Sequence, residues 1–219
     1  MVLGRPCCGM TFSELMVQAS DQTRSPTGLR PFRLLGEEAE MAPILAGEGV
    51  LRRVFAGAAE QTFEAELGIA DPPLVEYLVE LLLRFLRQEA IYRVRDTSGH
   101  RLTQVVDMVE EAEHRAARTR REIYRHVGDF TLFFSGLFPE HLPKLQAPDR
   151  KDHLLNYCQQ GKRSYLIAAS YAEDDESREQ APILRHLSEE FELCSEGLRR
   201  IRREIDLLPK LDSQSSAWN

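Results

Sequence analysis

The feature of this sequence that most constrains its fold is an apolar pattern near the C-terminal end. Apolar residues recur there in alternating steps of three and four positions, the spacing of one face of an α-helix. A strict seam of this kind favours packing against one straight partner helix with a left-handed supercoil. The sequence therefore predicts a long amphipathic C-terminal helix, whose partner belongs to the same chain or to a second copy. The seam consists of Leu184, Leu187, Phe191, Cys194, Leu198, Ile201, Ile205 and Leu208.

Prolines and turn-forming residues divide the rest of the chain. Pro182 fits the first turn of the C-terminal helix and Pro209 its end. The only strand-like stretch, residues 91–95, precedes a turn-forming segment, which favours at most one short β-hairpin near 91–103. Apolar periodicity predicts the other helices at 44–67, 73–88, from about 103, at about 118–138 and from about 149 to 171.

These patterns predict an all-α fold, a single-domain bundle of about five to six helices. The helical domain is expected at residues 42–209. Residues 1–41 carry turn chemistry without a sustained period and are expected to be a poorly ordered leader. Residues 210–219 are expected to form a polar tail.

Composition excludes several classes of protein. Hydrophobic residues make up 42% and charged residues 29%, which fits a globular chain and excludes a fully disordered or collagen-like one. The four cysteines lack the spacing of a zinc site. The longest apolar run, residues 74–86, carries three charges and is shorter than the roughly 20 residues of a bilayer span. No apolar run marks a secretory signal at residues 1–10, so we expect a cytoplasmic protein without a membrane partner.

Acidic residues and histidines share one face of the predicted helix at 118–138. Glu122, His126 and Asp129 are spaced i, i+4 and i+7. Glu111 and His114 add a Glu-x-x-His pair on the preceding helix, a pairing that di-iron sites in helical bundles use. Those sites need two such motifs and the chain has one, in a heavily charged stretch. The five residues are therefore weak metal-ligand candidates, and no cofactor is expected.

Asp129 is the most informative single residue, because it precedes an apolar stretch at 131–138. A carboxylate there is costly to bury without a cation or hydrogen-bond donors, and Lys162 or Arg163 is the expected partner. The structural interpretation is an ion pair that fixes the register of two helices. The functional interpretation is a polar ligand pocket formed by His126, Asp129, Tyr157, Lys162 and Arg163. We favour the first and leave the second open.

Motifs of common enzymes are missing. Gly161-Lys162 is not a Walker A loop, because Asn156 stands where the first glycine is needed and Arg163 where Ser or Thr is needed. Ser135 lacks the flanking glycines of a nucleophile elbow. These absences favour a protein that is not an enzyme.

A winged-helix DNA-binding regulator is the third alternative. The possible hairpin and its basic residues Arg93, Arg95 and Arg101 have the arrangement of a wing. Acidic residues are interleaved with the basic groups, however, and the formal net charge is -7. A nucleic-acid partner is therefore not expected.

Two blocks of sequence resemble a known group of proteins. The first is Gly128–Glu140, GDFTLFFSGLFPE, and the second is Lys151–His153, KDH, followed by Tyr157–Tyr165, YCQQGKRSY. In this order they resemble a family of uncharacterised, predicted all-helical bacterial proteins over roughly residues 42–172. The resemblance implies a single helical domain and carries no activity or catalytic residue.

Our leading hypothesis for function follows from the seam and from the missing catalytic motifs. It is a non-enzymatic cytoplasmic protein that acts through protein–protein contacts, as a homo-oligomer or with a helical partner. The alternative is a protein or enzyme that binds a small molecule or metal at a polar pocket around Asp129.

Overall fold

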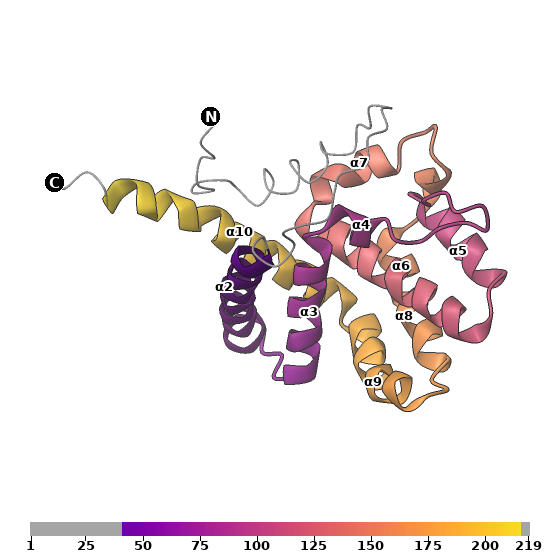
Figure 1. Ribbon diagram of the computed structural model, residues 1–219, viewed down its shortest axis with the longest axis horizontal. Helices are drawn as coiled ribbons and strands as arrows, with labels where there is room; N and C mark the ends of the chain where they lie inside the picture. The colour runs from indigo at the N-terminus through magenta and orange to yellow at the C-terminus, as the bar shows by residue number, and fades with distance from the viewer. Residues whose placement is uncertain (1–40, 216–219) are drawn as a thin grey trace, which may run out of the picture.

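The chain is helical throughout the part that the structure describes. This computed structural model describes the backbone of residues 41–215 and the side chains of residues 49–206. Nine α-helices and no strand lie within that range (Figure 1). The all-α prediction is therefore confirmed, although the helices outnumber the five to six that we expected. The predicted leader at 1–41 lies almost wholly outside the described residues.

The additional helices are mostly single turns, which apolar periodicity does not resolve. The elements are α2 (Met41–Glu60), the π-helical η1 (Gln61–Glu66), α3 (Pro72–Phe85), α4 (Gln88–Ile91), α5 (Val105–Glu113), α6 (Ala117–Leu137), the 3-10 helix η2 (Pro139–His141), α7 (Leu142–Leu145), the 3-10 helix η3 (Lys151–Leu154), α8 (Tyr157–Ser170), α9 (Asp175–Glu189) and α10 (Phe191–Ser215).

The connection from η1 to α3 follows the stop and start signals of its sequence. Gly68 has φ +71°, a left-handed conformation that glycine adopts without strain after a helix. The Asp71 side chain accepts a hydrogen bond of 3.2 Å from the Leu74 N–H, and Pro72 occupies the first helical position. These two residues begin α3, one position before the predicted start at 73.

Helix α6 forms the centre of the fold. Every residue from 126 to 138 is buried, and α8 and α10 pack against the helix (Figure 1). Two glycines allow α6 and α8 to approach closely. A Cβ at Gly128 would lie 2.6 Å from the Tyr165 ring, and one at Gly161 would lie 2.5 Å from Thr131 Oγ1. Larger residues at either position would therefore push the two helices apart.

Of the short hairpin that we allowed near 91–103, the structure has a minimal antiparallel pairing without a named strand. A single antiparallel bridge joins Arg95 to Arg101, and Ile91 belongs to α4. The turn between them is closed by Asp96, whose Oδ1 accepts from the Ser98 and His100 N–H groups, and by Gly99 at φ +87°.

The C-terminal pattern was predicted as one helix and is two. Asp174 caps α9 by accepting a 2.7 Å hydrogen bond from the Ser177 N–H, so the helix starts before Pro182, which lies inside it. Helix α9 ends at Glu189, and α10 begins at Phe191 and continues past Pro209. The expected polar tail at 210–219 is thus helical as far as Ser215.

The seam is filled within the chain. Leu184, Leu187, Phe191, Cys194, Leu198 and Ile201 are completely buried, and Ile205 is partly buried. Helix α10 crosses from α6 and α8 to α2 and η1, which supply the partners (Figure 1). Packing inside the chain therefore accounts for the six fully buried side chains of the seam. Leu208 lies outside the described side chains.

None of the described helices is long and apolar enough to cross a membrane.

Candidate functional site

Asp129 lies in the core and is held by three donors from two other helices. Its Oδ1 accepts hydrogen bonds from the hydroxyls of Tyr77 on α3, at 2.7 Å, and Tyr165 on α8, at 3.0 Å. Its Oδ2 pairs with Arg84 Nη2 of α3 at 2.7 Å. Burial, reinforced by the Asp129 charge, raises the pKa of both tyrosines well above the ordinary value, so both keep their protons and donate.

The ionic partner that we predicted for Asp129 was wrong. Lys162 pairs instead with Glu192 of α10 at 2.6 Å, and Arg163 is exposed. The reason is helical geometry, because Gly161, Ser164 and Tyr165 form the face of α8 that contacts α6. The cation comes from Arg84, which lies 45 positions earlier in the chain.

His126 is buried beside Asp129 and is not a ligand of anything described. Its Nε2–H donates 3.0 Å to the carbonyl of Ile91, and its ring packs against Phe85 and Phe130. Burial, and then the nearby Arg93, lowers the pKa of the imidazole to about 4. His126 is therefore neutral at physiological pH, which suits a packed core position.

Tyr157 belongs to a second buried carboxylate, which the sequence did not reveal. Its hydroxyl donates 2.8 Å to Asp152 Oδ2. Asp152 also accepts hydrogen bonds of 2.9 Å from the N–H groups of Val105 and Val106, and so caps the first turn of α5. Asp152 lies 46 residues after Val106 in the sequence, so no local pattern could identify it as the cap of α5.

The five metal-ligand candidates do not converge. Glu111 pairs with Arg115 at 2.5 Å, His114 bonds to the carbonyl of Glu110, and Glu122 is surrounded by arginines. His126 and Asp129 are engaged as described above. No group of three metal-binding side chains is found among the residues that the structure describes.

Arginines dominate the surroundings of Asp129. Arg93 and Arg125 interact electrostatically with both Asp129 and Arg84. Burial lowers the pKa of Arg93, and repulsion from Arg125 lowers it further. Asp129 and Glu122 are the carboxylates that face them. Positive charge is thus concentrated along the segment that runs from α3 to the bridge at Arg95.

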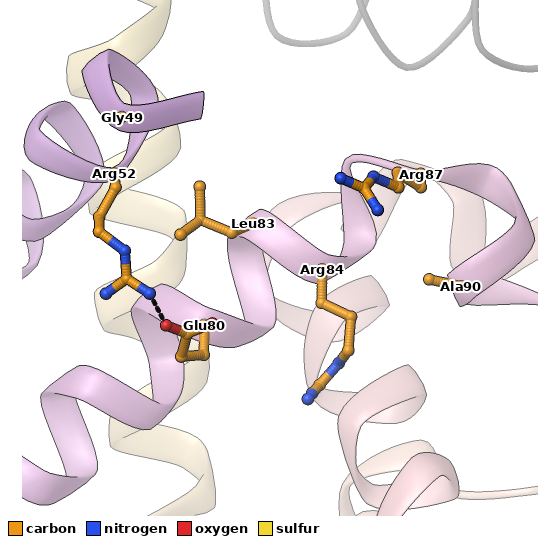
Figure 2. A pocket seen from close by; sticks show the side chains of 7 residues that line it. All are labelled: Gly49, Arg52, Glu80, Leu83, Arg84, Arg87 and Ala90. Carbon is orange, nitrogen blue, oxygen red and sulfur yellow. Dashed lines mark ion pairs between the residues drawn. The ribbon is translucent and has the colours of Figure 1, made fainter. Parts of the chain in front are cut away.

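One open pocket gives access to this region from the α2 side. It has a volume of about 460 Å³ and is lined by Arg52 of α2 and by Glu80, Arg84 and Arg87 of the α3–α4 segment (Figure 2). Figure 2 shows the ion pair between Arg52 and Glu80, with Arg84 one turn further along α3. The Arg84 side chain is 29% exposed overall, and its Nη2 is paired with Asp129.

No family model, curated protein or solved structure is significantly similar to this chain. The resemblance of the two sequence blocks to a bacterial helical family therefore finds no support in these comparisons.

Proposed function

We propose that this chain is a non-enzymatic cytoplasmic protein that acts by binding another protein, and that an acidic group of the partner docks in the pocket between α2 and α3. The partner is a second copy or another helical protein. Because the seam residues are buried in the chain, this pocket replaces the seam as the proposed contact.

The observation that carries the proposal is the way Arg84 is held. Both carboxylate oxygens of Asp129 accept hydrogen bonds from Arg84 and the two tyrosines, so Asp129 does not require a ligand as a partner. A guanidinium group has five N–H donors in one plane. When a carboxylate holds one of its nitrogens, the orientation of the other donors is fixed as well. Arg84 therefore suits recognition of a carboxylate rather than catalysis.

Arg52 lines the same pocket from α2, with Leu83 between it and Arg84 (Figure 2). It pairs with Glu76 at 2.6 Å and with Glu80, and both carboxylates are about half exposed. Exposed pairs of this kind contribute little to stability, about 0–1 kcal/mol, so an incoming carboxylate can exchange with them at small cost.

A peptide titration tests the proposal. The probe is a fluorescently labelled oligo-glutamate peptide, followed by anisotropy, with oligo-glutamine of the same length as the uncharged control. We expect the acidic peptide alone to bind, more weakly as salt increases. Arg52→Gln should weaken binding about tenfold, the effect of one charged hydrogen bond. Arg53→Gln is the matched control, because Arg53 is exposed on α2 and does not line the pocket. Equal binding of both peptides, or equal loss in both variants, would overturn the proposal.

A small anionic ligand in the same pocket is the second candidate. The volume of about 460 Å³ lies within the usual range of roughly 300–1,000 Å³ for small-molecule sites. Competition in the same anisotropy assay separates the two candidates. If the pocket binds a small anion, free glutarate should displace the labelled peptide at concentrations comparable to that of the peptide.

A further inference from the structure

A second pocket lined by arginines lies on the other side of the same cationic segment. Its volume is about 320 Å³. Arg93 and Arg95 enter it from the loop after α4, Arg115 from the loop after α5, and Thr119 from the first turn of α6. It shares no residue with the pocket at Arg52 and Arg84.

Each of the three guanidinium groups is oriented by a bond at one nitrogen. Arg95 Nη1 donates 2.8 Å to the Gly99 carbonyl, and Arg115 Nε donates 2.5 Å to Glu111. Arg93 Nη2 lies 3.3 Å from the Glu122 carbonyl. Since a guanidinium has five N–H donors, these bonds position the groups and leave other donors for a ligand.

The carboxylate that lines this pocket pairs with several arginines at once. Glu122 is the carboxylate among the lining residues, and it also pairs with Arg121 at 2.9 Å and Arg125 at 2.7 Å. Its distance to Arg93 Nη2 is longer, 3.6 Å. With Glu111 paired to Arg115, the three lining arginines lie beside two carboxylates, Glu111 and Glu122, so the local charge stays positive even though the chain as a whole is acidic.

We infer that the Arg93–Arg95–Arg115 pocket binds the phosphate group of a small ligand, with the Thr119 hydroxyl as a further donor. Guanidinium groups match the oxygens of a phosphate in pairs, and their charge complements a doubly charged anion better than a single carboxylate. The inference goes beyond the proposed function, because it concerns a different pocket and a different ligand. The three arginines carry it.

The test is calorimetric titration of the full chain with inorganic phosphate, at constant ionic strength maintained by chloride. We expect saturable binding at one site. Arg115→Gln and Arg95→Gln should each weaken it about tenfold or more, because each removes a charged donor. Arg53→Gln, remote from this pocket, should bind like the wild type. Thermal unfolding of each variant shows whether it is folded.

Two further titrations distinguish the kind of phosphate that binds and the pocket in which it binds. Titration with glycerol phosphate distinguishes a phosphate monoester from free phosphate, and binding of either kind supports the inference. Arg52→Gln should leave phosphate binding unchanged, so that this site and the proposed acidic docking pocket succeed or fail separately. No heat beyond that of chloride, or phosphate binding that is lost in Arg52→Gln but kept in folded Arg115→Gln, would overturn it.

Discussion

At the scale of single residues, Asp129 and Asp152 account for much of the polar chemistry in the described core. Each is almost completely buried, and each has its acceptors filled by donors from other elements. Asp129 connects α6 to α3 and α8, while Asp152 connects η3 to α5. Burial with complete hydrogen bonding is the condition under which an interior carboxylate stabilises a unique packing.

A pH dependence of stability is expected from His126. Its pKa is lowered from 6.5 to about 4 in the folded chain, first by burial and then by Arg93. The unfolded chain therefore binds a proton that the folded chain does not, so stability is complete above about pH 6.5 and falls as pH decreases toward 4. A shift of this size corresponds to roughly 3 kcal/mol at most.

Urea unfolding from neutral pH to about pH 4 measures this effect. His126→Gln keeps a donor for the Ile91 carbonyl without an imidazole that titrates, so its free energy of unfolding should fall less steeply than that of the wild type. His100→Gln, at an exposed position, is the control and should follow the wild type. A His126→Gln profile as steep as the wild-type profile would contradict the assignment.

At the scale of elements, the contact between α6 and α8 makes a prediction about glycine. Gly161→Ala places a methyl group against Thr131 and Phe191, and overpacking of this kind costs about 1–3 kcal/mol. Gly57→Ala, in α2 with no atom within 4 Å of the new methyl group, should instead stabilise the chain by about 0.5–1 kcal/mol. Thermal unfolding of both variants checks the pair. Equal shifts in one direction would show that α6 and α8 are less tightly packed than described.

Elements with strong local signals could be predicted from the sequence, and elements fixed by distant partners could not. Helix α6 spans 117–137 against a prediction of 118–138, because its apolar face and Pro139 are local signals. The end of α9 at Glu189 interrupts a continuous apolar seam, and nothing in the neighbouring residues marks it. The expected hairpin reduces to one bridge, since Ile91 joins α4 instead of a strand.

The same division applies to the candidate site. Burial and pairing of Asp129 could be expected from its position before an apolar stretch, but the choice of Arg84 over Lys162 depends on how α3 packs across α6. The role of Asp152 and its link to Tyr157 depends likewise on α5, more than 40 residues away. The arginine-lined pockets arise only when these segments are brought together.

At the scale of the whole molecule, a substitution in the buried seam tests whether these residues stabilise the fold or a dimer. Leu198 is fully buried between α10 and its neighbours, so Leu198→Asp places an unpaired carboxylate in the core. We expect a loss of about 4 kcal/mol or more, with unfolding as the visible result. Sedimentation velocity and circular dichroism of the variant measure both properties. A folded Leu198→Asp monomer obtained from a wild-type dimer would show that the seam is an interface after all.

We propose that Asp129 stabilises the fold while Arg52 and Arg84 bind an acidic partner. The most direct test measures unfolding and acidic-peptide binding for Asp129→Asn and Arg52→Gln side by side. Asp129→Asn should lose about 2–3 kcal/mol of stability, because Arg84 and the tyrosines lose a charged acceptor. Arg52→Gln should bind the peptide about tenfold more weakly with stability within about 0.5 kcal/mol of the wild type. An Asp129→Asn chain as stable as the wild type, or an Arg52→Gln chain that binds equally well, would contradict the account.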